Sequence, residues 1–253
     1  MNKNKKILNY WNKRSKNKLL KCTNDKLLEK NELKFLKSFI KKKSVILDIG
    51  CGEGTLLKYL RKNRNVKGIG LDYSSDLIKI AKKNSKNLEF ICWDMKKIDK
   101  ISFKLKNFDY IITKRSVQNL TSWKIQKKFI NMLHKFSSKK TKIILIESSK
   151  NSLTKINIFR KKLKLSKINM PWHNLYLDDN KIINSKFKKI KLKKIHEIFS
   201  TYYFISRIIN AVNSKQLKKK PSYNDKLNLI GWKLPQNLTK GFSQLKVYEF
   251  KKN

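Results

Sequence analysis

Three glycines alternate with other residues in the segment DIGCGEG, residues 48–54. The chain has only seven glycines in 253 residues, so nearly half of them stand in this one loop. The apolar run at 45–49 predicts a buried strand before the loop, and 56–60 predicts the start of a helix after it. Glycine permits a positive φ and lets a ligand lie against bare backbone, and the first turn of a helix offers free N–H groups. The segment is therefore suited to holding a small ligand over the carboxyl end of a strand.

The spacing of these glycines separates two kinds of ligand. Dinucleotide sites use the pattern G-x-G-x-x-G, whereas this chain has G-x-G-x-G with Asp48 two positions before the first glycine. A carboxylate beside the ligand suits a cation better than a pyrophosphate. The pattern D-x-G-x-G-x-G resembles motif I of the class I S-adenosylmethionine-dependent methyltransferases, whose ligand carries an ammonium and a sulfonium. The wider resemblance is to bacterial small-molecule and glycan methyltransferases.

The resemblance continues at the ends of the next predicted strands. In GIGLDYS it implies that Asp72 takes both ribose hydroxyls in a charge-assisted bidentate contact. In FICWDM it implies that Asp94 accepts a hydrogen bond from the adenine amino group, with its neighbours flanking the ring. After the fourth strand, Lys114 and Arg115 would lie near the methionine part and the methyl group. The other residues that the resemblance places in the cofactor site are Gly50, Cys51, Gly52, Gly54, Tyr73, Trp93 and Met95.

Strands and helices alternate through the first half of the chain. Apolar runs predict strands at 45–49, 68–71, 88–92, 108–113 and 142–147. Helical segments between them, such as 123–136, imply βαβ units and a parallel sheet. Two further strands are predicted at 188–195 and 245–250. We therefore expect an α/β fold, a Rossmann-like seven-stranded mostly parallel sheet with helices on both faces.

The predicted organisation is a single methyltransferase domain over residues 1–253. Its expected parts are two N-terminal helices (1–40), a cofactor-binding core (41–149), a lid and acceptor insertion after strand five (150–187), and C-terminal strands and helix (188–253). The helical pattern of the first part includes Leu19 and Leu20. The aromatic-rich stretch 200–212 predicts a helix, and the Lys/Asn-rich stretch 213–226 predicts a flexible loop.

His173 is the candidate catalytic base. Methyl transfer is an in-line displacement in which alignment supplies much of the rate, and a hydroxyl acceptor also needs a general base. His173 stands in MPWHNLYLDD, and imidazole titrates near neutral pH. The alternative is a structural histidine in a lid loop.

Several residues are candidates for binding the acceptor. Arg115 and Arg207 are two of only six arginines, and their forked donors suit an anionic acceptor. A surface salt bridge is the alternative for each. Trp172, Tyr176 and Tyr203 would supply apolar walls, with core packing as the alternative for Tyr203.

Composition bounds the partners and the compartment. The 63 Lys and Arg residues against 17 Asp and Glu give a net charge of +46. Many of the lysines are attributed to AT-rich codons, because Asn and Ile are also abundant. Three cysteines without a CxxC pair predict a reduced, cytoplasmic setting and no metal site. No apolar run approaches the ~20 residues of a membrane span.

Three functions remain open from the sequence. The leading one is O-methylation of a small molecule or sugar with S-adenosylmethionine as the cofactor. The net charge motivates a second, an RNA methyltransferase. Dispersed lysines and scarce arginine argue against it. TKRSVQN in place of an Asn/Asp-Pro-Pro-aromatic motif disfavours base N-methylation but leaves ribose or rRNA methylation open. The third is a non-catalytic protein that retains the S-adenosylmethionine site. No oligomeric state is indicated.

Overall fold

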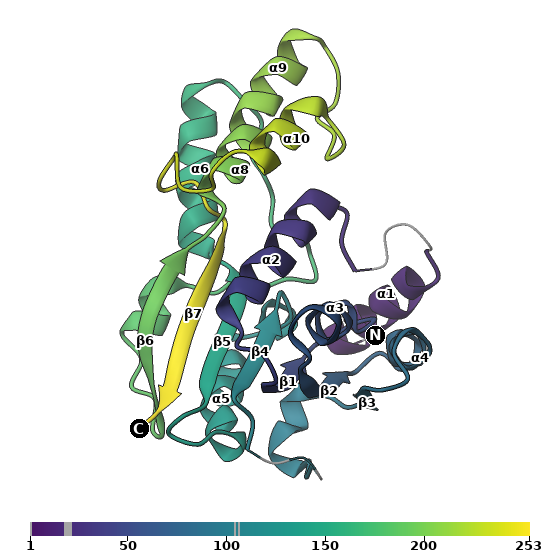
Figure 1. The fold of residues 1–253 in the computed structure, drawn as a ribbon. Coiled ribbons are helices and arrows are strands. Elements are labelled where there is room, and N and C mark those ends of the chain that lie inside the picture. Colours follow the sequence, from purple (N-terminus) through teal and green to yellow (C-terminus); the bar gives the residue numbers. More distant parts are fainter. Residues whose placement is uncertain (1, 18–21, 104, 106) are drawn as a thin grey trace.

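Seven strands form one sheet in the computed structural model, which describes residues 2–17, 22–103, 105 and 107–253 (Figure 1). In chain order the strands are β1 (Val45–Ile49), β2 (Lys67–Asp72), β3 (Glu89–Cys92), β4 (Tyr110–Lys114), β5 (Lys142–Ser148), β6 (Ile190–Glu197) and β7 (Leu245–Lys252). They lie in the order β3-β2-β1-β4-β5-β7-β6. Strands β1 to β5 pair in parallel, and β7 is antiparallel to both of its neighbours. The expected fold class is confirmed.

Helices cover both faces of this sheet and form a cap beyond one end of it (Figure 1). They are α1 (Lys3–Ser15), α2 (Lys26–Phe39), α3 (Thr55–Arg64), α4 (Ser75–Asn84), α5 (Trp123–Met132), α6 (Lys150–Lys162), α7 (Asp179–Ile183), α8 (Ser200–Phe204), α9 (Asn210–Gln216) and α10 (Lys226–Lys233). Short 3₁₀ segments are η1 (Met95–Lys100), η2 (Val117–Asn119) and η3 (Leu133–Phe136), and η4 (Ile205–Ile209) is π-helical. Ile46 packs with α2, α3 and α4 on one face, and Leu47 packs with α5 on the other. Because both are fully buried, β1 is apolar on both faces apart from Asp48.

A helical cap stands beyond the sheet end at which β1 gives way to α3 (Figure 1). It contains α6 and the run from α8 through η4 and α9 to α10. The Arg160 guanidinium donates to the Arg207 carbonyl, which ties α6 to η4. Lys215 Nζ donates to the Lys164 carbonyl at 2.9 Å, which ties the ends of α9 and α6. The cap therefore combines the segment after β5 with the segment between β6 and β7.

Two expectations for the helical segments need comment. The helix expected at 200–212 is present, with a π-helical turn at its centre. The flexible loop expected at 213–226 is wrong in extent, because α9 continues to Gln216 and α10 begins at Lys226. Asn228 Nδ2 donates to the carbonyls of Ser222 and Tyr223, at 2.8 and 3.2 Å. Polar residues that are typical of loops here serve as buried hydrogen-bond partners.

The helical pattern predicted for the N-terminal part includes Leu19 and Leu20, and these two residues lie outside the described residues. Within the described part of the chain, every helix is too short or too polar to cross a membrane.

Candidate functional site

The glycine loop between β1 and α3 folds back onto the end of β2. The N–H groups of Gly50 and Cys51 both donate to the Leu71 carbonyl, at 2.7 and 2.9 Å. Gly52 N–H donates to Asp72 Oδ2 at 2.9 Å. Both glycines have positive φ, a conformation that only glycine adopts without cost. The loop and the Asp72 carboxylate thus form one hydrogen-bonded unit at the carboxyl end of the sheet.

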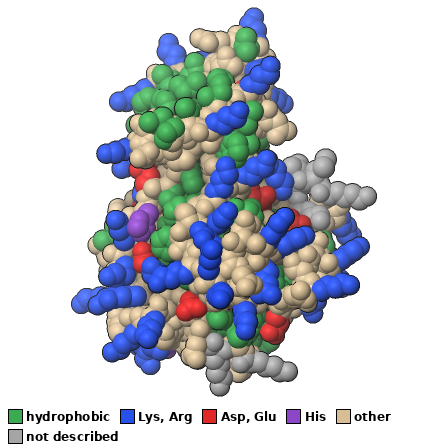
Figure 2. Space-filling model, viewed as in Figure 1, with side chains coloured by type: hydrophobic (Ala, Val, Ile, Leu, Met, Phe, Trp, Pro, Cys, Tyr) green, Lys and Arg blue, Asp and Glu red, His purple; other side chains and the backbone are tan. Residues whose placement is uncertain are grey.

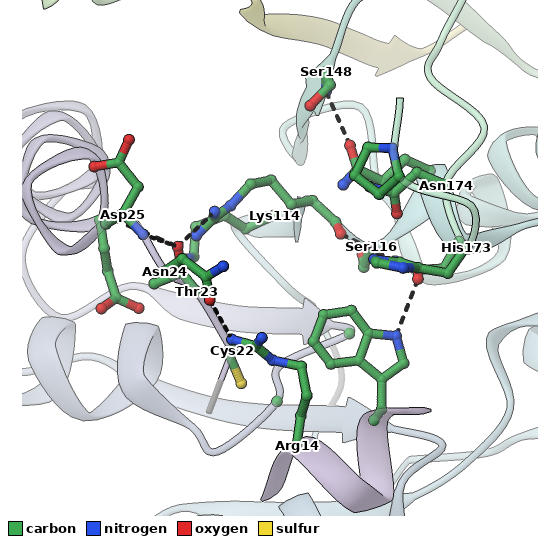
Figure 3. Close-up of a pocket in the computed structure, with 18 of the residues that line it drawn as sticks. Arg14, Cys22, Thr23, Asn24, Asp25, Lys114, Ser116, Ser148, His173 and Asn174 are labelled. Carbon is green, nitrogen blue, oxygen red and sulfur yellow. Dashed lines mark hydrogen bonds between the residues drawn. The ribbon is translucent and has the colours of Figure 1, made fainter. Parts of the chain in front are cut away.

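A cavity of about 330 Å³ lies between the strand ends, the N-terminal helices and the cap. Figure 3 shows Thr23 and Asp25 on one side of it and His173 and Asn174 on the other. The sequence-predicted residues that line it are Asp48, Gly50, Cys51, Gly52, Asp72, Tyr73, Met95, Lys114, Arg115, His173, Tyr176, Tyr203 and Arg207. Residues predicted for a cofactor and residues predicted for an acceptor therefore share one space.

Gly54 and Trp172 do not line the cavity. A Cβ added at Gly54 would lie 2.7 Å from the ring of Phe90, so this glycine permits close packing of α3 on β3. The Trp172 side chain is 54% exposed. It packs edge-on against Tyr10 and His173 from outside. Both residues therefore pack beside the cavity without lining it.

Trp93 and Asp94 also lie outside the lining, although Met95 beside them is part of it. The Trp93 indole N–H donates to the Lys97 carbonyl at 3.0 Å. Asp94 accepts from the Lys96 N–H at 2.9 Å and pairs with Lys96 Nζ at 3.2 Å. Both side chains therefore form hydrogen bonds with η1, and Asp94 is the N-cap of this segment.

Two aspartates face the cavity from the ends of β1 and β2. Asp48 is 1% exposed, and within the described residues its Oδ2 has no hydrogen-bond partner. Burial raises the pKa of Asp48 to about 7, although the positive charge of Lys114 lowers it in part. Burial also raises the pKa of Asp72 to about 6. Hydrogen bonds from backbone N–H groups, of which that of Ser74 has the largest effect, lower the pKa and offset part of this rise. A cationic ligand would offset the cost of burying these two carboxylates.

Both candidate acceptor-binding arginines form buried ion pairs with α2 and the residue before it. Arg115 Nε lies 3.1 Å from Glu32 Oε1, and Lys114 Nζ lies 3.0 Å from Glu32 Oε2. Arg207 Nη2 lies 3.2 Å from Asp25 Oδ2. The alternative expected for each arginine was a salt bridge at the surface. Each arginine does form a salt bridge, but with a buried carboxylate, because Glu32 and Asp25 are buried. These pairs hold α2 against η4 and the end of β4.

His173 stands in an aromatic cluster with α1. Its ring stacks on Tyr10 with centroids 4.3 Å apart and meets Trp11 edge-on at 5.6 Å. Burial and the nearby Arg14 charge lower the pKa of His173 to about 4, so the imidazole is neutral at pH 7. Within the described residues, His173 Nδ1 and Asn174 Oδ1 are buried without a hydrogen-bond partner. Two polar atoms on this wall are thus available to a ligand.

Glu147 holds the segment that follows β4. Its fully buried carboxylate accepts from the N–H groups of Ser116, Val117 and Gln118, at 3.0, 3.1 and 3.3 Å. Burial raises the pKa of Glu147 to about 7 against these bonds. Sequence reasoning gave this residue no role, although an acidic residue at the end of a buried strand is a usable signal.

The sequence also missed the residues that α1 contributes. Tyr10, Trp11 and Arg14 line the cavity. The Trp11 indole N–H donates to Asn119 Oδ1 at 3.0 Å, across 108 residues of sequence. Trp11 followed the apolar pattern of a helix, and that pattern carries no information about a distant polar partner.

Charge in the cavity lining is balanced, unlike charge in the whole chain. Four of the 17 acidic residues line it, and so do four of the 63 basic ones. The acidic ones are Asp25, Glu29, Asp48 and Asp72, and the basic ones are Arg14, Lys114, Arg115 and Arg207. The cavity therefore does not share the strongly basic character of the surface.

Solved structures with low sequence identity share this fold. The N-methyltransferase NodS from Bradyrhizobium japonicum is 10% identical over 97% of this chain and 98% of its own, with a TM-score of 0.58. The magnesium protoporphyrin IX methyltransferase ChlM from Synechocystis PCC 6803 is 10% identical over 100% and 98%, with a TM-score of 0.58. The plantazolicin methyltransferase BpumL is 18% identical over 98% and 90%, with a TM-score of 0.54. NodS and BpumL were solved with S-adenosylhomocysteine, and ChlM with S-adenosylmethionine.

Comparison with curated proteins finds no match. A family model described as a methyltransferase domain matches residues 40–201, which is more than half of the chain. This chain therefore belongs to the methyltransferase-domain family, and it is a methyltransferase with the class I S-adenosylmethionine-dependent fold.

Proposed function

We propose that this methyltransferase transfers the methyl group of S-adenosylmethionine to a hydroxyl of a small molecule or sugar. The observation that carries the proposal is the single cavity that joins the glycine loop to the wall formed by His173. Its volume of about 330 Å³ is near the lower end for small-molecule pockets. The three free cysteines suit a reducing compartment, and we place the enzyme in the cytoplasm.

The residues at the strand ends fit S-adenosylmethionine. Bare backbone at Gly50 and Gly52 lets a ligand approach closely. Asp48 Oδ2, which has no hydrogen-bond partner among the described residues, suits the positive charge of the cofactor. Asp72 remains able to accept hydrogen bonds from ribose hydroxyls, because each carboxylate oxygen has two lone pairs. Tyr73 and Met95 offer apolar surface for the adenine. When bound, the cofactor supplies an electrophilic methyl carbon on its sulfonium.

The acceptor side of the cavity favours a neutral, hydroxyl-bearing molecule. Balanced charge argues against a polyanion such as RNA, which binds strongly basic surfaces. Amide side chains both donate and accept hydrogen bonds, and the amides in the lining are Asn24, Gln118, Asn119, Asn169, Asn174 and Gln244. Aromatic rings pack against the C–H faces of sugars, and the aromatic lining residues are Tyr10, Trp11, Tyr73, Tyr176, Tyr203 and Tyr223. This combination suits a small polyol or sugar.

We assign His173 the role of accepting the hydroxyl proton as the new oxygen–carbon bond forms. Stacking on Tyr10 fixes the ring plane, and the lowered pKa keeps the imidazole unprotonated at pH 7. The same low pKa makes His173 a weak base, so proton transfer accompanies methyl transfer and does not precede it. The ion pairs of Arg115 and Arg207 hold α2 over the cavity and help to exclude water.

The proposed function is tested by acceptor screening. Labelled methyl transfer from S-adenosylmethionine is measured on a panel of sugars, small acids, hydroxylated aromatics and bulk RNA. We expect incorporation into a hydroxylated small molecule. Preferential labelling of RNA would replace the proposal with the nucleic-acid function.

His173→Ala should lower turnover about 100-fold or more, since a positioned proton acceptor contributes roughly that much. Affinity for S-adenosylmethionine, measured by calorimetry, should stay unchanged. His196→Ala is the matched control, because His196 lies on β6 and pairs with Glu249 at 3.3 Å. Full turnover by the His173 variant would assign that histidine a structural role.

Affinity for S-adenosylmethionine should fall about tenfold between pH 8 and pH 6. A cation binds the ionised form of Asp48, so the pKa of this group is lower in the complex than its free value of about 7. Affinity is therefore full above pH 7 and is lost as the pH falls, because only about a tenth of such a group is ionised at pH 6. Asp72, with a pKa of about 6, acts in the same direction. Calorimetry in two buffers would also detect the released proton, and equal affinity at both pH values would refute the assignment.

A further inference from the structure

Two cap helices each expose an apolar stripe along one face. On α6 the exposed stripe is Lys155, Ile158, Phe159, Lys162 and Leu163. On α10 the exposed stripe is Lys226, Leu229, Ile230, Lys233 and Leu234. Both follow the spacing i, i+3, i+4, i+7, i+8, which is one helix face. A surface helix normally turns such a stripe toward the core, whereas these two turn it toward solvent.

The α6 stripe meets the connection that follows α10. The Phe159 ring packs against Phe242, which follows α10, with centroids 5.3 Å apart. Leu238, in the same connection, is 62% exposed. Figure 2 shows hydrophobic side chains gathered over the cap, with Lys and Arg side chains around them. We call this surface the cap face and define it as Ile158, Phe159, Leu163, Leu229, Ile230, Leu234 and Leu238.

The cap segments are almost free of negative charge. Residues 149–177 contain seven Lys and Arg and no Asp or Glu. Residues 198–248 contain nine Lys and Arg and a single acidic residue, Asp225. The occupant of the cap face must therefore offer both an apolar phase and negative charge.

We propose that the cap face binds peripherally to the surface of an anionic lipid bilayer. Leucine, isoleucine and phenylalanine side chains would enter the interface, while lysines at the ends of each stripe reach the phosphates. Anionic headgroups complement the basic cap. A second copy fits poorly, because two chains of charge +46 repel one another. Nucleic acid offers charge without an apolar phase. The proposal concerns a surface outside the cavity and is independent of the proposed reaction.

Vesicle flotation tests this surface. The full chain is mixed with vesicles of phosphatidylglycerol and phosphatidylcholine, or of phosphatidylcholine alone, at about 0.1 M and about 1 M NaCl. We expect flotation with the anionic vesicles at the lower salt. A part should persist at the higher salt, where charge interactions are screened within about 3 Å and apolar contact remains.

The variants Ile158→Ser and Ile230→Ser distinguish insertion of apolar side chains into the bilayer from electrostatic attraction of the basic chain to anionic lipid. Each should lower partition into anionic vesicles about tenfold, as expected for removal of a buried isoleucine. Ile183→Ser on α7 is the matched control, since Ile183 is 59% exposed and Ile158 is 57% exposed. The control should float like the wild type. Unchanged thermal unfolding and cofactor affinity in all three would show that the fold and cavity are intact.

Three results would overturn the proposal. Equal flotation of the two cap variants and the control would show that the cap face is not inserted. Complete loss of binding at high salt would reduce the interaction to charge alone. A dimer in light scattering that Ile230→Ser dissociates would assign the face to a second copy of the chain.

Discussion

Gly50→Ala is expected to abolish cofactor binding and to destabilise the protein by about 3 kcal/mol or more. Gly50 has a φ of +79°, where an L-residue costs roughly 1–2 kcal/mol. The added Cβ would also lie 2.2 Å from Ser116 Cβ, so one of the two segments must move. Ser116 cannot move freely, because its hydroxyl donates to the Ile49 carbonyl at 2.8 Å and its N–H donates to Glu147. The glycine loop would therefore shift out of the position that a ligand requires.

Gly241→Ala is the control that distinguishes the cost of a positive φ from the cost of the steric clash at Gly50. Gly241 has a φ of +85°, and a Cβ there would meet nothing within 4 Å. This control should lose only about 1 kcal/mol and should bind S-adenosylmethionine like the wild type. Adding Ser116→Gly to Gly50→Ala should recover part of the lost stability, because it removes the clashing Cβ. Wild-type affinity in Gly50→Ala, measured by calorimetry, would mean that the cofactor does not use this loop.

The sheet was predictable because its central strands have a simple physical signature. A parallel strand covered by helices on both faces carries a nearly continuous apolar run, as residues 45–47 in β1 and 143–146 in β5 do. The alternating edge strand β6 was recognisable for the opposite reason, since part of it is exposed to solvent. Helix α10 was not recognised, because its eight residues follow a Lys/Asn-rich stretch and include Asn228 and Gly231, which disfavour a helix.

The two sides of the cavity differed in how far the sequence could predict them. The proposed cofactor side depends on one loop and on residues that directly follow strands, so local pattern identified most of its lining, although Gly54, Trp93 and Asp94 lie outside it. The acceptor side is assembled from α1, the segment before α7, and η4. Its main tie, Asp25 with Arg207, spans 182 residues. Pattern alone identified Arg207 as unusual but could not supply the carboxylate that neutralises it.

Asp48→Asn is expected to weaken cofactor binding and, at the same time, to stabilise the ligand-free protein. The pKa of the buried Asp48 is about 7, against an ordinary value of 3.8. The folded wild type therefore holds a proton that the unfolded chain has already released between pH 4 and 7. Wild-type stability falls as the pH rises through this window, by up to about 4 kcal/mol above it. Asparagine does not titrate, so the variant escapes this loss.

Thermal unfolding at two pH values measures the effect. The stability advantage of Asp48→Asn should be clear at pH 8 and small at pH 4. Asp76→Asn is the control, because Asp76 lies in the first turn of α4, where losing its charge should cost a few tenths of a kcal/mol through the helix dipole. Calorimetry should show at least a tenfold loss of S-adenosylmethionine affinity in Asp48→Asn at pH 8. A variant less stable than the wild type at pH 8 would mean that the carboxylate already has a partner. Opposite signs for stability and affinity are expected only where a buried charge is kept for a ligand.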